Sequence, residues 1–249
     1  MLDDFTSCII ALYRLSFAVG IASLYIAKVY IPDFLEYGKT LKNHSRKDIN
    51  PLLDQVIHFT LPKAYFSHFY ILSLTLSIIT VVRYYQYPIT WILLFHSSRR
   101  LYETLFVSKY TGSRMNWSHY VVGLWFYSVL HIILNTKLAS NDINSNLNMI
   151  SLCLFLYSSR EQFKSHQILA NLKKYSLPQD RLFQYVCSPH YLCEIGIYLS
   201  FVPYNLEFLF PLIWVIASLS VSAAETKRYY QDKFKDNVVP KYAIIPYIL

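Results

Sequence analysis

One run places ionisable side chains inside an otherwise apolar stretch. It reads His96-Ser97-Ser98-Arg99-Arg100-Leu101-Tyr102-Glu103. On a helix, the His, both Arg and the Glu of this run share a face through i+3 and i+4 spacings. Arg99 can then pair with Glu103, which leaves the second cation for an anion such as phosphate. The alternative is that both arginines snorkel toward water from the end of a membrane helix.

A second polar group opens a later apolar stretch, Ser188-Pro189-His190-Tyr191-Leu192-Cys193-Glu194. Ser followed by Pro is typical of a helix start, where exposed N–H groups favour an anion. His190 and Glu194, four residues apart, lie on one face of that helix. The carboxylate can orient the imidazole, or bind a ribose or amide donor. A buried structural His and Glu pair is the competing interpretation.

Two further segments carry weaker signals. His68 stands in Pro62-Lys63-Ala64-Tyr65-Phe66-Ser67-His68-Phe69-Tyr70, where it could donate a proton, hydrogen-bond a carbonyl, or simply pack. The tail run Lys227-Arg228-Tyr229-Tyr230-Gln231-Asp232-Lys233-Phe234 could form an amphipathic helix on lipid headgroups. The eight His show no His-x-x-x-His or His-Glu-x-x-His pair, so no metal site is predicted.

The elements that carry these groups are predicted to be membrane helices. The chain has 249 residues, of which 54% are hydrophobic and 15% charged, against roughly one quarter charged in soluble domains. We therefore expect an all-α, multi-pass membrane protein with a single domain over residues 1–249. Seven stretches are interrupted little by charge and are predicted to span the bilayer: 8–27, 64–82, 88–107, 117–135, 147–160, 186–202 and 206–223.

The distribution of cations predicts the orientation. Seven spans put the two ends on opposite faces, and all but three of the 23 Lys and Arg then fall on one face. The exceptions are Arg14, Arg83 and Lys137. The positive-inside rule makes the basic face cytosolic, so we expect a lumenal N-terminus and a cytosolic C-terminus. The net charge of +8 is attributed to this topology and to anionic lipid, and no motif indicates nucleic-acid binding.

Several longer runs carry a family resemblance. The run Leu177-Pro178-Gln179-Asp180-Arg181-Leu182-Phe183-Gln184-Tyr185-Val186-Cys187-Ser188-Pro189-His190-Tyr191-Leu192-Cys193-Glu194, with Tyr229-Tyr230, Phe234 and Pro240-Lys241-Tyr242-Ala243-Ile244-Ile245-Pro246-Tyr247, resembles the C-terminal domain of the steroid 5α-reductase family. Residues 62–70, 96–103 and 166–173 resemble its polyprenal (formerly polyprenol) reductase branch. The similarity covers most of the chain from about residue 60 onward.

The resemblance implies a seven-helix enzyme of the endoplasmic reticulum that binds NADPH from the cytosol. No Rossmann fold is implied, which agrees with only 5 Gly and no G-x-G-x-x-G run. The cofactor-binding part would be residues 147–249, aided by the third span. The family's cofactor positions fall on Arg100, Gln162, His166, Lys173, Tyr175, His190, Glu194 and Tyr230. Three of them depart from the steroid enzymes, where His166 is Asp, His190 is Asn and Lys173 is Arg.

The resemblance also bears on the substrate. The steroid branch uses a Glu and a Tyr against its ketone, and Phe69 and Ser97 appear at those places. This argues against a steroid and leaves His68 or His96 as the catalytic donor. Hydride adds to a carbon–carbon double bond when a conjugated carbonyl accepts the charge. The implied reaction is reduction of the α-isoprene double bond of polyprenal to dolichal, toward dolichol for protein N-glycosylation, with a long-chain polyprenoid lipid as substrate and no predicted protein partner.

Two alternatives remain at this point. An isoprenylcysteine-type methyltransferase is also a small helical membrane enzyme with a cytosolic cofactor, and binding of S-adenosylmethionine rather than NADPH would identify it. A non-catalytic lipid-binding membrane protein would use the third-span cations only to anchor headgroups. In that case substituting Arg100 or Glu194 would leave dolichol levels unchanged.

Overall fold

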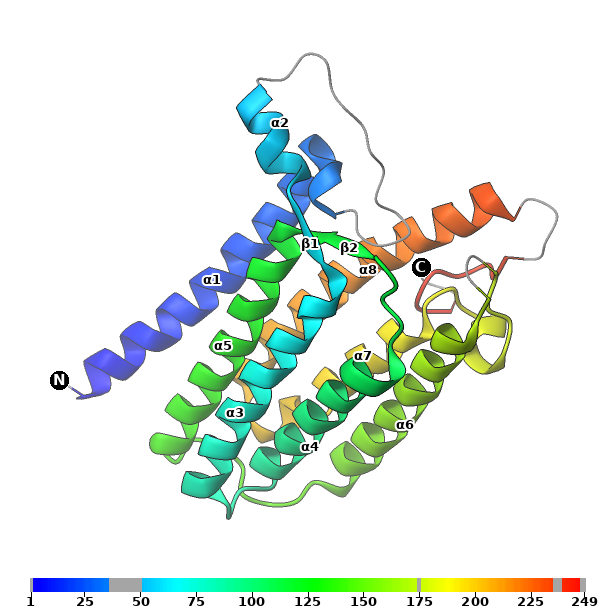
Figure 1. Ribbon diagram of the computed structural model, residues 1–249. Helices are drawn as coiled ribbons and strands as arrows, with labels where there is room; N and C mark the ends of the chain where they lie inside the picture. The colour runs from blue at the N-terminus through cyan, green and yellow to red at the C-terminus, as the bar shows by residue number, and fades with distance from the viewer. Residues whose placement is uncertain (1, 36–50, 174–175, 235–238, 247–249) are drawn as a thin grey trace.

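The protein is a bundle of long helices (Figure 1). The computed structural model describes residues 2–35, 51–173, 176–234 and 239–246. The elements in chain order are α1 (Leu2–Tyr30), η1 (Pro32–Leu35), α2 (Pro51–His58), β1 (Thr60–Pro62), η3 (Lys63–Tyr65), α3 (Phe66–Tyr84), α4 (Pro88–Tyr102), η4 (Glu103–Val107), β2 (Arg114–Asn116), α5 (Trp117–Ala139), α6 (Met149–Asn171), η5 (Arg181–Gln184), α7 (Pro189–Leu199), η6 (Val202–Tyr204), η7 (Leu206–Phe208) and α8 (Leu209–Lys233).

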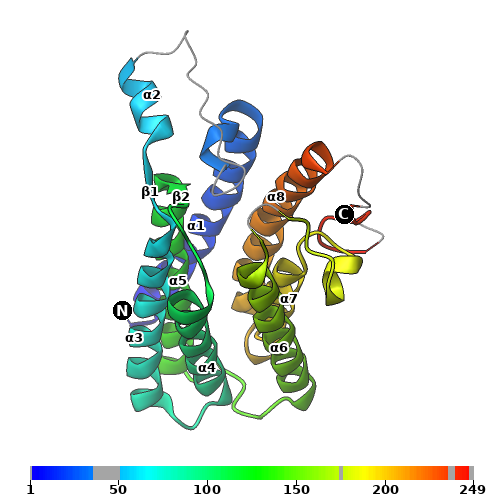
Figure 2. The same ribbon diagram turned by 45° about the vertical axis from the view of Figure 1, so that its right-hand side comes forward.

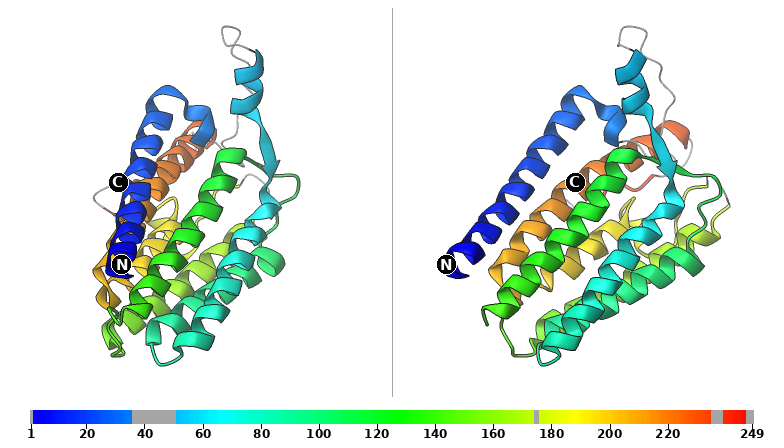
Figure 3. Two further views of the ribbon diagram at one scale, coloured as in Figure 1. Left: turned by 90° about the vertical axis from the view of Figure 1, so that its left-hand side faces the viewer. Right: turned by 60° about the vertical axis from the view of Figure 1, so that its left-hand side comes forward.

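The long helices form two groups. α3 packs against α4 and α5, while α7 packs against α6 and α8. Figure 2 shows the two groups side by side, with α4 and α6 facing each other across the bundle. α1 runs along the outside against α8 and α5, as Figure 3 shows. The candidate site described below lies where α4 meets α6 and α7.

Every predicted span falls on a helix. Among the described residues, four helical stretches are long and apolar enough to cross a membrane, namely Asp4–Tyr30, Lys63–Tyr84, Trp117–Ala139 and Leu206–Lys233. The remaining three expected spans lie on α4, α6 and α7, which are shorter or more polar. The chain is thus a mostly helical multi-pass membrane protein. The seven-span count and the orientation stay predictions.

Two helices continue well past the expected end of their spans. The fifth expected span stops at residue 160, where charges begin, but α6 runs on to Asn171. It continues because Glu161, Gln162 and Ser165 are buried against neighbouring elements rather than exposed. The tail after residue 223 is likewise the last part of α8 and not a separate helix on headgroups, because its Tyr230 side chain is buried.

Helix starts follow local sequence. The Asn116 side chain accepts a hydrogen bond from the Ser118 backbone N–H at the start of α5, and Asn148 accepts one from Ser151 at the start of α6, each at 3.0 Å. α4 and α7 begin at a proline, whose missing N–H costs nothing in the first turn. These caps fix where each helix begins and which of its residues face the interior.

Short extended segments close one end of the bundle. β1 and β2 pair antiparallel, with Leu61 opposite Met115, and so join the chain before α3 to the chain before α5. Near the start of α7, Val186 forms a parallel bridge with Tyr242, and the Cys187 N–H donates to the Tyr242 carbonyl at 3.0 Å. We call this the sheet end. The opposite end, with residues 85–87 between α3 and α4, is the turn end (Figure 1).

Candidate functional site

The site begins at the C-terminal end of α4. There the helix widens into the π turn η4, in which the Ser108 N–H donates to the Glu103 carbonyl at 2.8 Å. Glu103 is fully buried, with 0% of its surface exposed. Single π turns inside helices are frequent at functional sites. A buried carboxylate needs cationic or hydrogen-bonding partners, and three such partners surround this one.

Glu103 is held by two arginines and a histidine. Its carboxylate is bonded to Arg99, to Arg100 Nη1 at 2.5 Å and to His166 Nδ1 at 2.6 Å. The predicted Arg99 and Glu103 pair is confirmed. The expectation that the second cation stays free of protein partners is wrong, because Arg100 also bonds Glu103 and its Nη2 donates to the Tyr70 hydroxyl at 2.5 Å.

Gln162 on α6 links three helices. Its side-chain oxygen accepts from Arg99 Nη2 at 2.7 Å on α4. Its amide nitrogen donates to the Glu194 carboxylate and to the His190 carbonyl at 3.2 Å, both on α7. The His166 and His190 rings lie 5.6 Å apart. The residues gathered here are His96, Arg99, Arg100, Glu103, Gln162, His166, His190 and Glu194, and we call them the polar cluster.

His96, like Glu103, is fully buried within the polar cluster. Its Nδ1 is 3.4 Å from Arg99 Nη2. A guanidinium only donates, so Nδ1 is the acceptor and the neutral ring carries its proton on Nε2. Within the described residues Nε2 has no hydrogen-bond partner, and Glu194 Oε1 is 3.9 Å away. His96 therefore offers a buried N–H donor beside a carboxylate.

The surroundings of His166 lower the pKa of its imidazole. Burial lowers the pKa of its imidazole, and the Arg100 cation lowers it further, while Glu103 acts in the opposite direction. The His166 Nδ1 lies 2.6 Å from a Glu103 carboxylate oxygen and 3.1 Å from Arg100 Nη1, and a neutral ring can donate to the first or accept from the second, but not both. His166 thus lies between the carboxylate and one of the cations of the polar cluster.

The polar cluster fits the predicted nicotinamide cofactor chemically. Carboxylate, carboxamide and imidazole groups suit the carboxamide and ribose hydroxyls of such a molecule, and the arginines suit its charge. Besides His96, Arg99 and Arg100 each have a buried Nε without a partner in the part of the chain that the structure describes. These donors are available to an acceptor from outside the chain.

The other predicted residues lie apart from the polar cluster. Lys173 is exposed just beyond α6, Tyr230 is buried near the end of α8, and Tyr175 lies outside the described residues. Lys227 donates to the Lys241 carbonyl at 2.7 Å and so ties α8 to the C-terminal segment. The His68 side chain is exposed, stacks on Tyr65 and contacts the Tyr120 hydroxyl at 3.0 Å.

Sequence reasoning missed two sets of contacts. The Tyr70 hydroxyl is bonded to Arg100, whereas the sequence had assigned Tyr70 no role beyond its place in the run 62–70. Ser97, expected only as a departure from the steroid branch, hydrogen-bonds Ser73 at 2.7 Å and Ser77 at 3.2 Å. His131 Nε2 lies 3.2 Å from Ser73, which makes a buried polar network between α3, α4 and α5. The sequence signal that could have predicted this network is the presence of polar residues within expected membrane spans, where such residues usually have a partner.

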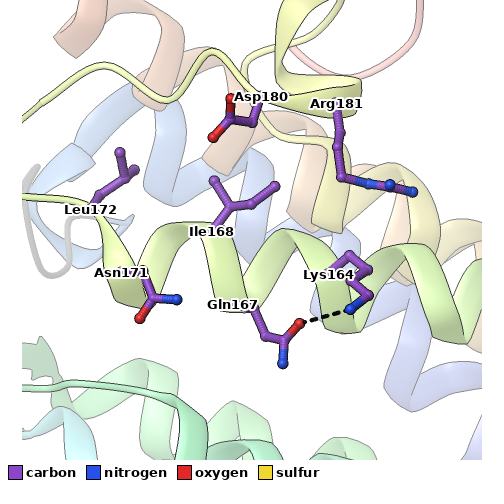
Figure 4. A pocket seen from close by; sticks show the side chains of 7 residues that line it. All are labelled: Lys164, Gln167, Ile168, Asn171, Leu172, Asp180 and Arg181. Atoms are coloured by element: carbon purple, nitrogen blue, oxygen red, sulfur yellow. Dashed lines mark hydrogen bonds between the residues drawn. The ribbon is translucent and has the colours of Figure 1, made fainter.

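A separate pocket of about 340 Å³ lies along the last turns of α6 (Figure 4). None of the predicted cofactor residues that the structure describes lines it. Arg181 on its rim has φ +55° and binds the buried Glu161 carboxylate through two contacts of 2.6 and 2.7 Å. This ion pair fastens η5 to α6, and so fixes the segment that leads into α7. The lining residues are Lys164, Gln167, Ile168, Asn171, Leu172, Asp180 and Arg181.

Comparisons with known proteins give related matches. A family model described as 3-oxo-5-alpha-steroid 4-dehydrogenase matches residues 131–249, which include α6, α7 and α8. The chain is 57% identical over 238 residues to the polyprenal reductase of Saccharomyces cerevisiae, covering 95% of this chain and 94% of that protein. It is 29% identical to the polyprenal reductase of Caenorhabditis elegans, covering 88% and 87% of the two chains. For the polyprenal reductase of Homo sapiens the identity is 26%, with 87% and 85% covered.

Proposed function

This chain belongs to the steroid 5α-reductase family, in its polyprenal reductase branch, and on that premise we propose that it reduces the α-isoprene double bond of polyprenal to give dolichal, with NADPH as reductant. The observation that carries the proposal is 57% identity over 94% of the length of the yeast polyprenal reductase. The chain is then an oxidoreductase acting on a CH–CH group. Its product would feed dolichol formation for protein N-glycosylation.

The chemistry favours an aldehyde over an alcohol. In polyprenal the carbonyl is conjugated with the double bond, so its oxygen accepts the charge that develops when the β carbon is reduced. An allylic alcohol offers no such acceptor. When bound, NADPH supplies the hydride, and the chain has to hold the substrate carbonyl near proton donors while it excludes water. The buried His96 Nε2–H is one donor that supports this role.

We assign cofactor binding to the predicted positions. Gln162 and Glu194 are bonded to each other, and Arg100 and His166 are joined through Glu103, which supports a nicotinamide and ribose subsite there together with His190. Lys173 would supply a cation for a phosphate, although as a point charge and not a bidentate fork. Tyr175 and Tyr230 complete the proposed set. For the substrate carbonyl we retain His96 and His68, of which only His96 belongs to the polar cluster.

The proposed topology follows from the charges. We propose seven spans in the endoplasmic reticulum membrane, with the N-terminus lumenal and the C-terminus cytosolic, in a single domain whose residues 147–249 hold most of the cofactor. The placement of each expected span on a helix supports the count. The apolar outer surface, for example on α1, suits lipid and a long-chain polyprenoid substrate. No nucleic-acid or protein partner is proposed.

The direct test is reduction by the purified full-length chain in lipid nanodiscs. We expect NADPH-dependent conversion of polyprenal to dolichal by mass spectrometry, little conversion of polyprenol, and no reaction with S-adenosylmethionine. Reduction of a steroid enone with polyprenal untouched would overturn the proposal. In cells that lack the chain, polyprenoids should accumulate at the expense of dolichols. Unchanged dolichol levels would favour the non-catalytic alternative.

A further inference from the structure

Tyr70 on α3 is a buried phenol next to the polar cluster. Only 6% of its surface is exposed. Its hydroxyl is 2.5 Å from Arg100 Nη2, and the Arg100 guanidinium also lies over its ring, 4.7 Å from the centroid. Arg100 is in turn bonded to Glu103. Tyr70 is therefore held in place by the same cation that organises the polar cluster.

The direction of this hydrogen bond decides what Tyr70 can do. A guanidinium has donors and no acceptor, so the phenolic oxygen must accept from Arg100. The proton of Tyr70 is then directed elsewhere. Among the described residues, Arg100 is the one hydrogen-bond partner of the Tyr70 hydroxyl, and no acceptor for the phenolic proton is found there. Tyr70 is thus a proton donor whose oxygen is hydrogen-bonded to the positively charged Arg100.

We propose that Tyr70 is a catalytic residue that donates its phenolic proton to the aldehyde oxygen of the substrate, an inference that rests on the proposed function. As hydride forms the new C–H bond at the β carbon, the electron pair of the carbon–carbon double bond shifts toward the carbonyl, and its oxygen takes the Tyr70 proton to give the enol. The enol then returns that proton to the phenolate while the α carbon takes one proton from solvent. One hydride and one solvent proton are consumed.

The charge of Arg100 suits this step. Negative charge appears first on the substrate oxygen and then on the phenolate, and a fixed cation at 2.5 Å stabilises the second. Arg100 does not have to move, because its Nη1 is already bonded to the Glu103 carboxylate at 2.5 Å. The competing role for Tyr70 is positioning alone, in which the phenol only orients Arg100 toward the cofactor.

Tyr70→Phe in the full-length enzyme separates the two roles, because it removes one hydroxyl and keeps the ring. The matched control is Tyr127→Phe, which removes the hydroxyl of a buried tyrosine whose ring lies 5.6 Å from that of Tyr70. For Tyr70→Phe we expect kcat with polyprenal to fall about 10²- to 10³-fold, the usual loss for one oxyanion donor. The Kd for NADPH, measured by its fluorescence, should stay within about twofold, and C4-deuterated NADPH should give a larger isotope effect. Tyr127→Phe should keep its kcat.

Three outcomes would overturn the proposal. One is Tyr70→Phe with kcat within about threefold of the unmodified enzyme. Another is a weakened Kd for NADPH with kcat restored at saturation, which would make Tyr70 a positioning residue. If Tyr70→Phe fails to bind NADPH at all, replacement of Tyr70 by 3-fluorotyrosine decides, because the more acidic phenol must shift the pH dependence of kcat to lower pH, and an unchanged profile contradicts the donor role. An unmodified enzyme inactive on polyprenal would instead refute the proposed function.

Discussion

Two buried glutamates at different places in the bundle are each held by two cationic side chains. Glu103, where α4 ends, is bonded to Arg99 and Arg100. Glu207, which precedes α8 at the turn end, receives Arg14 through contacts of 2.5 and 3.2 Å and has Lys137 at 3.9 Å. By residue type the two sites are nearly equivalent, so the difference between them lies in what else the cations and the carboxylate contact.

The two glutamate sites differ in how many hydrogen-bond donors of their arginines remain buried without a partner. At Glu207 the side chain of Arg14 is 53% exposed to the outside, and the backbone is closed locally by Tyr13, which donates to the Glu207 carbonyl, and by Asn205. At Glu103 the arginine side chains are only 10% and 14% exposed, and each keeps a buried Nε without a partner among the described residues. A closed set fastens helices together, whereas a buried set with spare donors can bind a ligand.

The Glu207 site also accounts for two exceptions in the charge distribution. Arg14 and Lys137 are two of the three basic residues predicted to lie away from the basic face. Both have Glu207 as an ion-pair partner. Two of the three exceptional cations are therefore compensated by a carboxylate of the protein itself.

The largest contrast is expected from the same substitution at the two sites. Arg100→Lys keeps the charge but loses the planar fork that bonds Tyr70 and Glu103 together. We expect kcat/KM for polyprenal to fall by at least about 100-fold, since a buried charge-assisted hydrogen bond at the reacting end is lost. Arg14→Lys should retain nearly full activity. Both variants are compared by single-turnover reduction in nanodiscs.

Equal losses of activity in these two variants would contradict the comparison. The guanidinium group would then be needed for folding at both positions and not specifically for the function of the polar cluster. Thermal midpoints recorded on the same preparations separate the possibilities. Arg100→Lys with a midpoint close to that of the unmodified chain and a low rate supports a functional role for the polar cluster.

The next effect concerns Gly196 on α7, where Ser158 of α6 comes close to the α7 backbone. A Cβ added at Gly196 would collide with Ser158 Oγ and lie 3.3 Å from Ser158 Cβ. Gly196→Ala should separate the helices that carry Gln162 and Glu194, with a cost of about 1–3 kcal/mol and roughly tenfold lower activity. Adding Ser158→Ala removes the colliding oxygen and should restore most of the rate. No rescue in the double variant would place the defect elsewhere.

These residues also show what the sequence could predict. Each of the seven stretches expected from hydropathy lies on a helix, and the i+4 spacing identified the Arg99 and Glu103 pair, because both depend on neighbours along the chain. The short helix α2 was not predicted. The contacts of Tyr70 with Arg100 and of Arg14 with Glu207 join residues 30 and 193 positions apart. No local sequence pattern encodes which helix packs against which. The structure was therefore needed to identify the partners of each charge and the difference between the two glutamate sites.

A smaller effect, on stability alone, is expected at Glu207. Glu207→Gln removes the charge that Arg14 and Lys137 share, but the exposed Arg14 can be solvated instead. We expect a loss of about 1 kcal/mol, which corresponds to a thermal midpoint about 2–4 °C lower, with kcat/KM unchanged. The same substitution at Glu103 would leave two buried arginines with Glu194 as the remaining carboxylate of the polar cluster and should cost several kcal/mol, about 3–5. A reversed order of the two stabilities would show that Glu207 is the more tightly enclosed charge.

The smallest effect is expected for Lys137→Gln. Lys137 Nζ lies 2.8 Å from the Asp142 carboxylate, whose side chain is 61% exposed. Its distance to the better buried Glu207 carboxylate is longer, 3.9 Å. An ion pair with an exposed partner contributes about 0.2–1 kcal/mol, and Arg14 still compensates Glu207 after the change. The thermal midpoint should therefore fall by no more than about 2 °C, and by less than in Glu207→Gln. A fall as large as that of Glu207→Gln would mean that Lys137, and not Arg14, is the cation that neutralises this carboxylate.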